Sequence, residues 1–232
     1  MSTATPKIDW PVLLTVRGKM LPNSLEEMRV VHNRTAGAAP GIAAARALGD
    51  LSHLAYAPYV GLPQSTAKPG ELLFLDVWQS PKGIMDFFSN EQVIQQGTKL
   101  FSARDATIWV RAEGSFSYAL PAARGKNDRL VAMLRGPIAS AEKAIDVFRA
   151  VDINGQRDAR RRGLLSHDLF IKLTAPGDTS PVELLGIDVW SDRAGMAEHY
   201  GDATHMKALG SVFTGAPDPS AWEPAAGEWS EW

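Results

Sequence analysis

Two histidines near the end of the sequence are the side chains best placed for acid–base chemistry. His199 and His205 lie on either side of Gly201 and Asp202, 205 − 199 = 6 positions apart. Imidazole titrates near neutral pH, so either ring could accept and return a proton, and both are candidate catalytic residues. On an unbroken helix six positions span roughly 240°, so the rings converge only if Gly201-Asp202 interrupts the helix. The structural alternatives are a His199 bonded to a carboxylate or a backbone carbonyl, and a capping or packing role for His205.

An acidic and an aromatic residue precede these histidines on an expected strand. Asp188 and Trp190 occupy alternate positions of the apolar run 183–190, so their side chains share one face. A buried carboxylate is costly without a partner, and an ion pair with Arg17 or Arg135, or a helix cap, is the alternative to a catalytic role. The candidate substrate-binding residues are Trp190, Asp188, His167 and Tyr200.

The sequence around this strand occurs twice. Residues 71–78 are ELLFLDVW and residues 183–190 are ELLGIDVW, and the shift of 183 − 71 = 112 positions holds without a gap to Phe101 and Phe213. A long self-similar period indicates a duplicated structural unit. We therefore expect a first repeat over 1–113, a linker over 114–128 and a second repeat over 129–232.

Cap and turn signals divide each half into strand, helix, strand, strand, helix and strand. Ser24, Ser80, Ser140 and Asp192 are typical helix N-caps, each placed before a run with helical spacing. The expected strands are 12–17, 51–60, 71–78 and 107–111 in the first half, then 129–135, a run from 165 and 182–190; prolines obscure the last strand, and 228–232 is a candidate edge strand. This order is the ferredoxin-like split βαβ arrangement.

A single ferredoxin-like sheet carries helices on one face only, so its other face needs a cover. A second unit in the same chain can supply that cover, sheet against sheet. The predicted fold class is therefore α+β, with two ferredoxin-like βαββαβ units forming an intramolecular α+β barrel, a pseudo-dimer. The almost entirely apolar run 71–78 predicts a strand that is buried on both faces.

Composition narrows the possible partners. The formal net charge is −2 and no long basic run occurs, so nucleic acid and anionic membranes are poor candidates. The sequence has no cysteine, which excludes disulfides, thiolate catalysis and cysteine-ligated metals. No apolar run approaches the ~20 residues of a membrane span, and residues 1–9 lack an apolar signal core. We expect a soluble, cytoplasmic protein with a small-molecule ligand, present as the monomeric pseudo-dimer or as a homodimer of it.

Motifs for bound cofactors are missing from the sequence. The five histidines include no His-x-x-His or Glu-x-x-His pair on one expected helix, which argues against a zinc site. No glycine-rich dinucleotide motif, P-loop or Gly-x-Ser-x-Gly elbow occurs. We therefore predict no metal and no cofactor.

The stretch 188–213 resembles the antibiotic biosynthesis monooxygenase family of dimeric α+β barrels. The resemblance rests on an aromatic residue that ends a strand, a capping Asp, a helix His, a second His and a Phe. These are Trp190, Asp192, His199, His205 and Phe213. The first expected helix, with His32, also resembles the EthD-like branch of the same superfamily, so the branch stays open.

The resemblance implies a pocket between sheet and helices in each unit, and a range of activities. Some members oxidise polyphenolic polyketides without metal or flavin, some degrade haem with a helix His and a strand Trp, and many have no known activity. The expected function is a cofactor-independent monooxygenase-like enzyme acting on a small aromatic or polyketide-like molecule, with His199 as base and Trp190 lining the pocket. The alternatives are a non-catalytic small-molecule-binding or stress-response barrel, and a haem-binding or haem-degrading protein.

The two halves differ at the positions of the candidate bases. Phe87 and Val93 stand in the first half where His199 and His205 stand in the second. Both halves keep a strand histidine, His53 or His167, which on an apolar face is more often a hydrogen-bonded interior residue than a catalyst. We expect the polar or catalytic site in the second half and an apolar space in the first.

Overall fold

The computed structural model describes residues 11–120, 129–175 and 177–232. The first half contains β1 (Val12–Met20), α1 (Leu25–Arg34), α2 (Ala39–Ala47), β2 (Asp50–Pro58), β3 (Glu71–Trp78), α3 (Pro81–Phe88), α4 (Glu91–Leu100) and β4 (Phe101–Arg111). The second half contains β6 (Leu130–Pro137), α5 (Ala141–Arg161), β7 (Leu164–Lys172), β8 (Glu183–Trp190), α6 (Arg193–Gly201), α7 (Ala203–Gly210) and β9 (Asp218–Pro224). A short strand, β5 (Tyr118–Ala119), lies between the halves in the sequence and pairs with β7.

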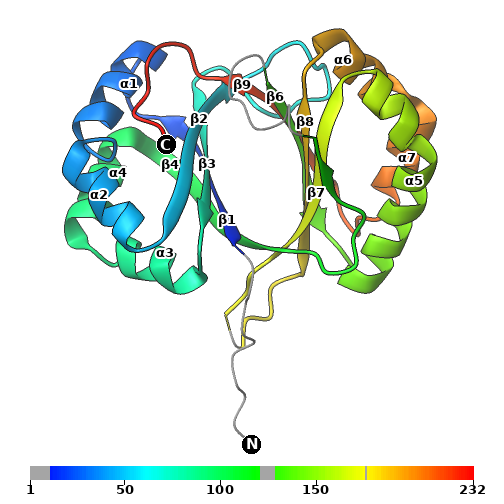
Figure 1. Cartoon of the computed structure of the whole chain (residues 1–232), viewed down its shortest axis with the longest axis horizontal. Coiled ribbons are helices and arrows are strands. Elements are labelled where there is room, and N and C mark those ends of the chain that lie inside the picture. The colour runs from blue at the N-terminus through cyan, green and yellow to red at the C-terminus, as the bar shows by residue number, and fades with distance from the viewer. Residues whose placement is uncertain (1–10, 121–128, 176) are drawn as a thin grey trace, which may run out of the picture.

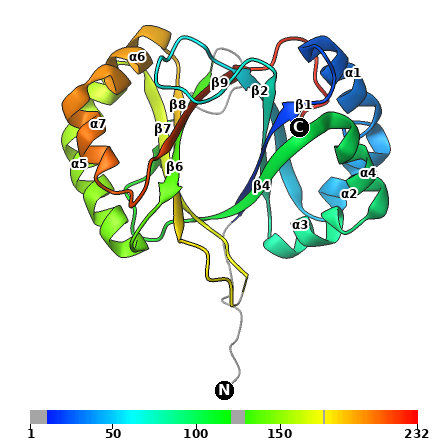
Figure 2. The same cartoon turned by 180° about the vertical axis from the view of Figure 1, so that it is seen from behind.

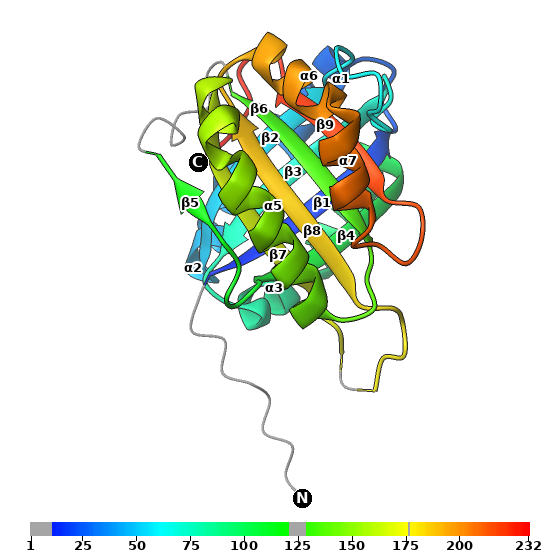
Figure 3. The same cartoon turned by 90° about the vertical axis from the view of Figure 1, so that its right-hand side faces the viewer.

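The strands close into one antiparallel barrel. Their order is β4-β1-β3-β2-β9-β6-β8-β7, and β7 pairs back onto β4 through Phe170, Ile171 and Lys172. Figure 1 shows α1 to α4 on one side of the barrel and α5 to α7 on the other, and Figure 2 shows the same layers from behind. In the side view of Figure 3, α5 and α7 lie across the outer face of the strands β6, β8 and β7. The mixed α+β barrel expected from the sequence is confirmed.

One part of the expectation was wrong. Instead of two separate sheets that pack face to face, the two four-stranded groups are hydrogen-bonded at both edges, by β2 with β9 and by β4 with β7. Each group still faces the other across the barrel interior. Closure removes the unpaired edges that two open sheets would leave, which satisfies backbone groups that would otherwise bond to water or to another chain.

Strand β3 has buried side chains on both faces, as its apolar sequence predicted. Leu73 and Leu75 belong to the cluster inside the barrel, with Trp109 and Trp222. Leu72 and Phe74 point to the helices instead and pack with Met28 and others. β8 follows the same rule, with Leu185 inside and Leu184 outside. The barrel wall therefore separates an apolar interior from two helix-covered layers.

The expected helix caps are in place. The side chains of Ser24, Ser80, Ser140 and Asp192 each accept a hydrogen bond from the backbone N–H three residues ahead. Gly83 and Gly195, which match in the repeat, lie where a Cβ would come within 2.0 and 1.8 Å of the carbonyl oxygens of Leu48 and Arg162. The first turns of α3 and α6 can therefore take this position only with glycine there.

The end of the chain differs from the expected edge strand. The strand is β9, at 218–224, and residues 228–232 form no regular strand, although Trp232 exchanges two backbone hydrogen bonds with His53. Residues 1–10 and 121–128, which include part of the expected linker, lie outside the described residues; its described part, 114–120, contains β5. Within the described ranges, the helices are too short or too polar to cross a membrane.

Candidate functional site

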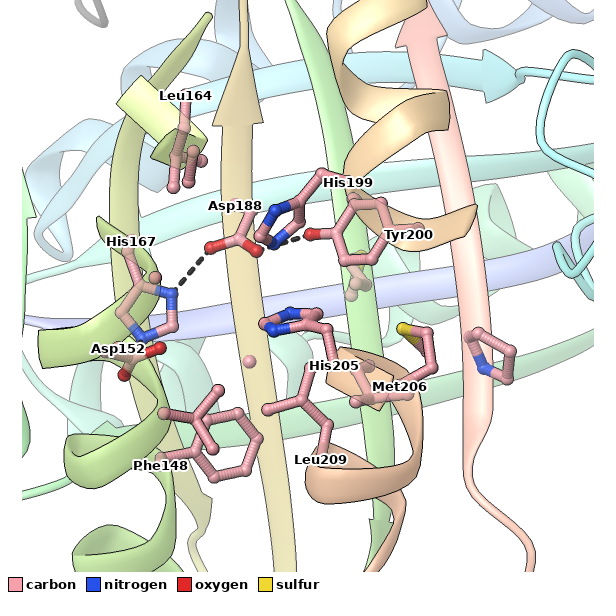
Figure 4. A pocket seen from close by; sticks show the side chains of 18 of the residues that line it. Phe148, Asp152, Leu164, His167, Asp188, His199, Tyr200, His205, Met206 and Leu209 are labelled. Carbon is pink, nitrogen blue, oxygen red and sulfur yellow. Dashed lines mark hydrogen bonds and ion pairs between the residues drawn. The ribbon is translucent and has the colours of Figure 1, made fainter. Parts of the chain in front are cut away.

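A cavity of about 60 Å³ lies between the outer face of the second-half strands and the helices α5, α6 and α7. We call it the second-half cavity. Its three histidines and one of its carboxylates point toward one another from different elements: His167 from β7, Asp188 from β8, and His199 and His205 from α6 and α7 (Figure 4). Apolar side chains form much of the remaining wall; they include Leu134, Phe148, Leu164, Met206 and Leu209.

Asp188 is the centre of a buried hydrogen-bond network. Asp188 and His167 face each other in the β7–β8 ladder, and His167 Nδ1 donates to Asp188 Oδ1 at 2.6 Å. The hydroxyl of Tyr200 donates to the other carboxylate oxygen, Oδ2. On the far side of the imidazole, His167 Nε2 lies 3.0 Å from Asp152 Oδ2, on α5. The partners expected for Asp188, Arg17 or Arg135, were wrong: these arginines pair with Glu71 and Glu183.

The two carboxylates keep His167 charged. Burial alone lowers the pKa of His167, but Asp188 and Asp152 more than compensate and raise this pKa to about 10. Burial likewise raises the pKa of Asp188, but the His167 cation and the bonds from His167 and Tyr200 hold that pKa below its usual value. His167 is thus an imidazolium at neutral pH, and it can donate a proton or stabilise an anion but cannot act as a base there.

Tyr200 stays protonated at neutral pH. Burial and the negative charge of Asp188 raise the pKa of its hydroxyl well above the usual value. The hydroxyl is therefore a hydrogen-bond donor to Asp188 and not a phenolate. Its role in this arrangement is to hold the carboxylate in one orientation beside the cavity.

His199 and His205 converge because the helix breaks between them. α6 ends at Gly201, and the carboxylate of Asp202 caps α7 by accepting from the backbone N–H of Thr204 and His205. The ring centroids of the two histidines are 4.2 Å apart and the rings are tilted by 55°. The helix interruption that the sequence required for convergence is present.

Burial keeps both helix histidines uncharged at neutral pH. Burial, followed by the neighbouring His205, lowers the pKa of His199 to about 4, and Asp188 opposes this shift. Burial also lowers the pKa of His205. At neutral pH both rings are therefore neutral, with a nitrogen lone pair free to accept a hydrogen bond or a proton.

Trp190, which was expected to line the pocket, is not among the residues that line the cavity. It is fully buried, and its ring centroid is 5.1 Å from that of His199 and 5.7 Å from that of Tyr200. The indole packs against these two side chains in the helix-covered layer outside the barrel, together with Met196. The other predicted site residues, His167, Asp188, Tyr200, His199 and His205, all line the cavity.

Asp152 and Tyr118 also line this cavity, although neither was predicted from the sequence. Asp152 follows Phe148 by four positions on α5, so it falls on the same inward face as the apolar residues. An acidic residue at that position of an amphipathic helix was the available signal. Tyr118 lies on β5, opposite His167, in a segment that the sequence analysis treated as linker.

The first half contains a related network, so the expectation of an apolar space there was wrong. His53 Nδ1 donates to Asp76 Oδ1 at 2.7 Å, and the two residues face each other in the β2–β3 ladder as His167 and Asp188 do in theirs. A buried helix histidine, His32, places its Nε2 3.0 Å from His53 Nε2. Phe87 and Phe88 line the cavity beside this network, together with Asp50.

In the part of the chain that the structure describes, no cluster of three or more His, Asp or Glu side chains has a geometry that could hold a metal ion. His167 is held between two carboxylates. His199 and His205 face each other, but they lack a third ligand.

Comparisons with known proteins reveal a common fold. No protein family and no curated protein sequence matches the chain. The structure of an anthrone oxidase-like protein superposes with a TM-score of 0.63 at 12% identity, over 95% of this chain and 93% of that one. A protein from Lactobacillus acidophilus NCFM, provisionally named a monooxygenase, superposes with a TM-score of 0.58 at 9% identity, over 93% and 94%. A protein from Fusobacterium nucleatum subsp. nucleatum ATCC 25586 with the same provisional name gives 0.57 at 9%, over 93% of both chains. At identities this low the likeness shows the fold alone, a closed α+β barrel.

Proposed function

We propose that the second-half cavity is the catalytic site of a cofactor-independent monooxygenase that acts on a small aromatic or polyketide-like molecule. The observation that carries this proposal is the pair of neutral imidazoles, His199 and His205, beside the buried carboxylate Asp188 on a largely apolar cavity. The likeness to an anthrone oxidase-like protein supports the same class of chemistry.

In this proposal His199 removes a proton from the substrate. Its neutral state at pH 7 leaves the lone pair available, and the charge of Asp188 favours the imidazolium that forms. The substrate must therefore have an acidic C–H or O–H whose anion is delocalised over an aromatic system. The positive charge of His167 stabilises an anion in the same cavity.

The anion then reacts with dioxygen, which is the only oxidant required. For an anthrone-type substrate the deprotonated carbon gives an electron pair to O2, a C–O bond forms, and the peroxide takes the proton from His199. Loss of the second C–H proton and cleavage of the O–O bond release water and leave a ketone. The sum is Ar2CH2 + O2 → Ar2C=O + H2O, in which carbon is oxidised and dioxygen is reduced.

Oxygen uptake by the purified protein with anthrone tests the proposal. Turnover above the autoxidation rate supports it, provided that the His199→Ala variant loses this turnover. Saturable binding without turnover would favour the alternative of a non-catalytic binding barrel. A Soret band on addition of haemin, with no anthrone turnover, would favour a haem protein and contradict the proposal.

We further infer that the two halves arose by duplication of one βαββαβ unit. The sequence repeat at a fixed shift supports this, as do the matching strand orders β4-β1-β3-β2 and β9-β6-β8-β7 around a shared His–Asp ladder pair. An experimental structure in which residues 12–111 do not superpose on 130–224 would contradict it.

A further inference from the structure

A second cavity, of about 70 Å³, lies between the first-half strands and the helices α1 to α4. We call it the first-half cavity. It is on the opposite side of the barrel from the second-half cavity, since α1 to α4 and α5 to α7 cover opposite sides (Figure 2). Aromatic rings make up much of its wall: Phe74, Trp78, Phe87, Phe88, Phe101 and Trp232.

Three residues that line this cavity each have a buried polar atom with no hydrogen-bond partner among the described residues. These atoms are Asp50 Oδ1 and the indole nitrogens Nε1 of Trp78 and Trp232. Asp50 is 5% exposed and Trp78 1% exposed, so neither side chain can be satisfied by bulk water. A buried polar group without a partner is costly, and such groups in a cavity wall indicate a missing ligand group.

The neighbouring histidines cannot satisfy these atoms, because their own nitrogens are already engaged. His53 bonds to Asp76 through Nδ1 and to His32 through Nε2, and His32 Nδ1 bonds to Asn33 Oδ1. Burial lowers the pKa of His32 to about 4, whereas Asp76 outweighs burial and raises that of His53. His53 is therefore the donor to His32, and the whole chain of bonds is complete without a ligand.

The segment after β9 closes one side of the first-half cavity. The ring of Trp232 stacks on His53 with centroids 4.8 Å apart and an angle of 24°. Two backbone hydrogen bonds with His53 fix this residue, and Glu231 accepts from the backbone N–H of Ala55. The last residues of the chain thus supply both a wall and an N–H group to a cavity that is otherwise formed by the first half.

We propose that the first-half cavity is a second binding site, for a phenol-sized aromatic alcohol. A hydroxyl group donates one hydrogen bond and accepts two, which matches one carboxylate oxygen and two indole N–H groups. The aromatic walls suit a flat ring. The volume of about 70 Å³ leaves room for a small ligand. This site is independent of the function proposed for the second-half cavity.

Titration of the full-length 15N-labelled protein with phenol, followed through the indole N–H resonances, tests the proposal. The signals of Trp78 and Trp232 should shift with one common midpoint, and they should do so equally in the His199→Ala variant. Toluene, which has the same ring with a methyl group in place of the hydroxyl, should bind and shift these signals through its ring current, but without the downfield ¹H shift that a new hydrogen bond produces. Absence of saturable shifts at Trp78 and Trp232, or shifts lost with His199→Ala, would overturn it.

Matched variants separate hydrogen bonding from simple apolar binding. Trp78→Phe should weaken phenol binding roughly twofold to tenfold, the range for one hydrogen bond, and should weaken toluene binding less. Trp232→Phe should do the same at a less buried position, in case the first variant fails to fold. Trp222→Phe is the control, because its indole already bonds to Ser220 inside the barrel, away from the cavity. Equal losses of affinity for phenol and for toluene would contradict the proposed recognition of the hydroxyl group.

Discussion

The imidazole rings of His199 and His205 stand with their centroids 4.2 Å apart on the wall of the second-half cavity. Asp202 ends one helix and caps the next, and this turn brings together rings that a continuous helix would point in different directions. The proximity has an electrostatic consequence, because both rings cannot readily be protonated together. After burial, His205 is the largest cause of the low pKa of His199, about 4.

Replacing His199 by alanine should abolish most of any oxygenase turnover. The change removes the proposed base, and loss of a general acid or base typically lowers kcat by ~10²–10⁴. Steady-state oxygen uptake with anthrone would measure it. His53→Ala, a matched histidine change in the other half, should have a much smaller effect. Comparable losses from both variants would contradict the assignment of the chemistry to the second half.

Stability should decline on the acidic side of about pH 6.5. The folded pKa of His199 and of His32, each about 4, is below the unfolded value of about 6.5. Between these values the unfolded chain binds protons that the folded chain does not, so acid favours unfolding. The slope is at most about 1.4 kcal/mol per pH unit for each histidine. Urea unfolding between pH 4.5 and 6.5 measures it, and His199→Gln should reduce the slope.

Stability should also decline on the alkaline side, for the opposite reason. The folded pKa of His167, about 10, is above its unfolded value. Its contribution is therefore fully present below about pH 6.5 and is lost as the pH rises through 10. Urea unfolding between pH 6.5 and 9 should show the decline, and His167→Gln should flatten it. An alkaline slope unchanged by His167→Gln would show that His167 is not the charged group inferred from the structure.

The strands that were predicted correctly are those whose residue pattern fits only one kind of secondary structure. β3 matches the expected 71–78 because burial on both faces leaves a continuous apolar run, and helix starts were marked by their capping side chains. β9 escaped prediction because Pro219 and Pro224 lie within it, and proline is atypical of paired strands. The edge pairings that close the barrel join residues far apart in the sequence, so no local sequence pattern could predict these pairings.

Site residues could be predicted from the sequence where they lie close together along the chain or belong to the repeated motif. The contribution of Asp152 depends on how α5 packs over β7, which is a tertiary relation. The first-half network was hidden for the same reason, since His32 and His53 come from a helix and a strand that meet only in the fold. Phe87 and Val93 led to the expectation of an apolar space because they are the local substitutes for the helix histidines.

A polypeptide of residues 1–120 should not behave as a stable monomer. In the intact chain β2 pairs with β9 and β4 pairs with β7, so the fragment would expose both edges and the inner face of its sheet. Expression should give insoluble or self-associating material, which size-exclusion chromatography and light scattering would detect, with the full chain as control. A soluble, folded monomer would contradict the dependence of each half on the other.

Asp188→Asn should lower the free energy of unfolding and also change the pKa values of the site histidines. The carboxylate is buried and bonded to His167 and Tyr200, so its neutralisation leaves the His167 cation with Asp152 alone. Removal of one partner of a buried ion pair costs about 3–5 kcal/mol, and the remaining carboxylate should keep the loss near the lower limit. The pKa of His167 should fall, and so should that of His199, because Asp188 raises both. Urea unfolding and NMR titration of the histidine resonances would measure these changes.

Asp76→Asn is the matched control: it breaks the equivalent pair with His53 and should leave the titration of His199 unaltered. An Asp188→Asn protein with wild-type stability and an unshifted His167 would show that this network does not set the charge state of the site.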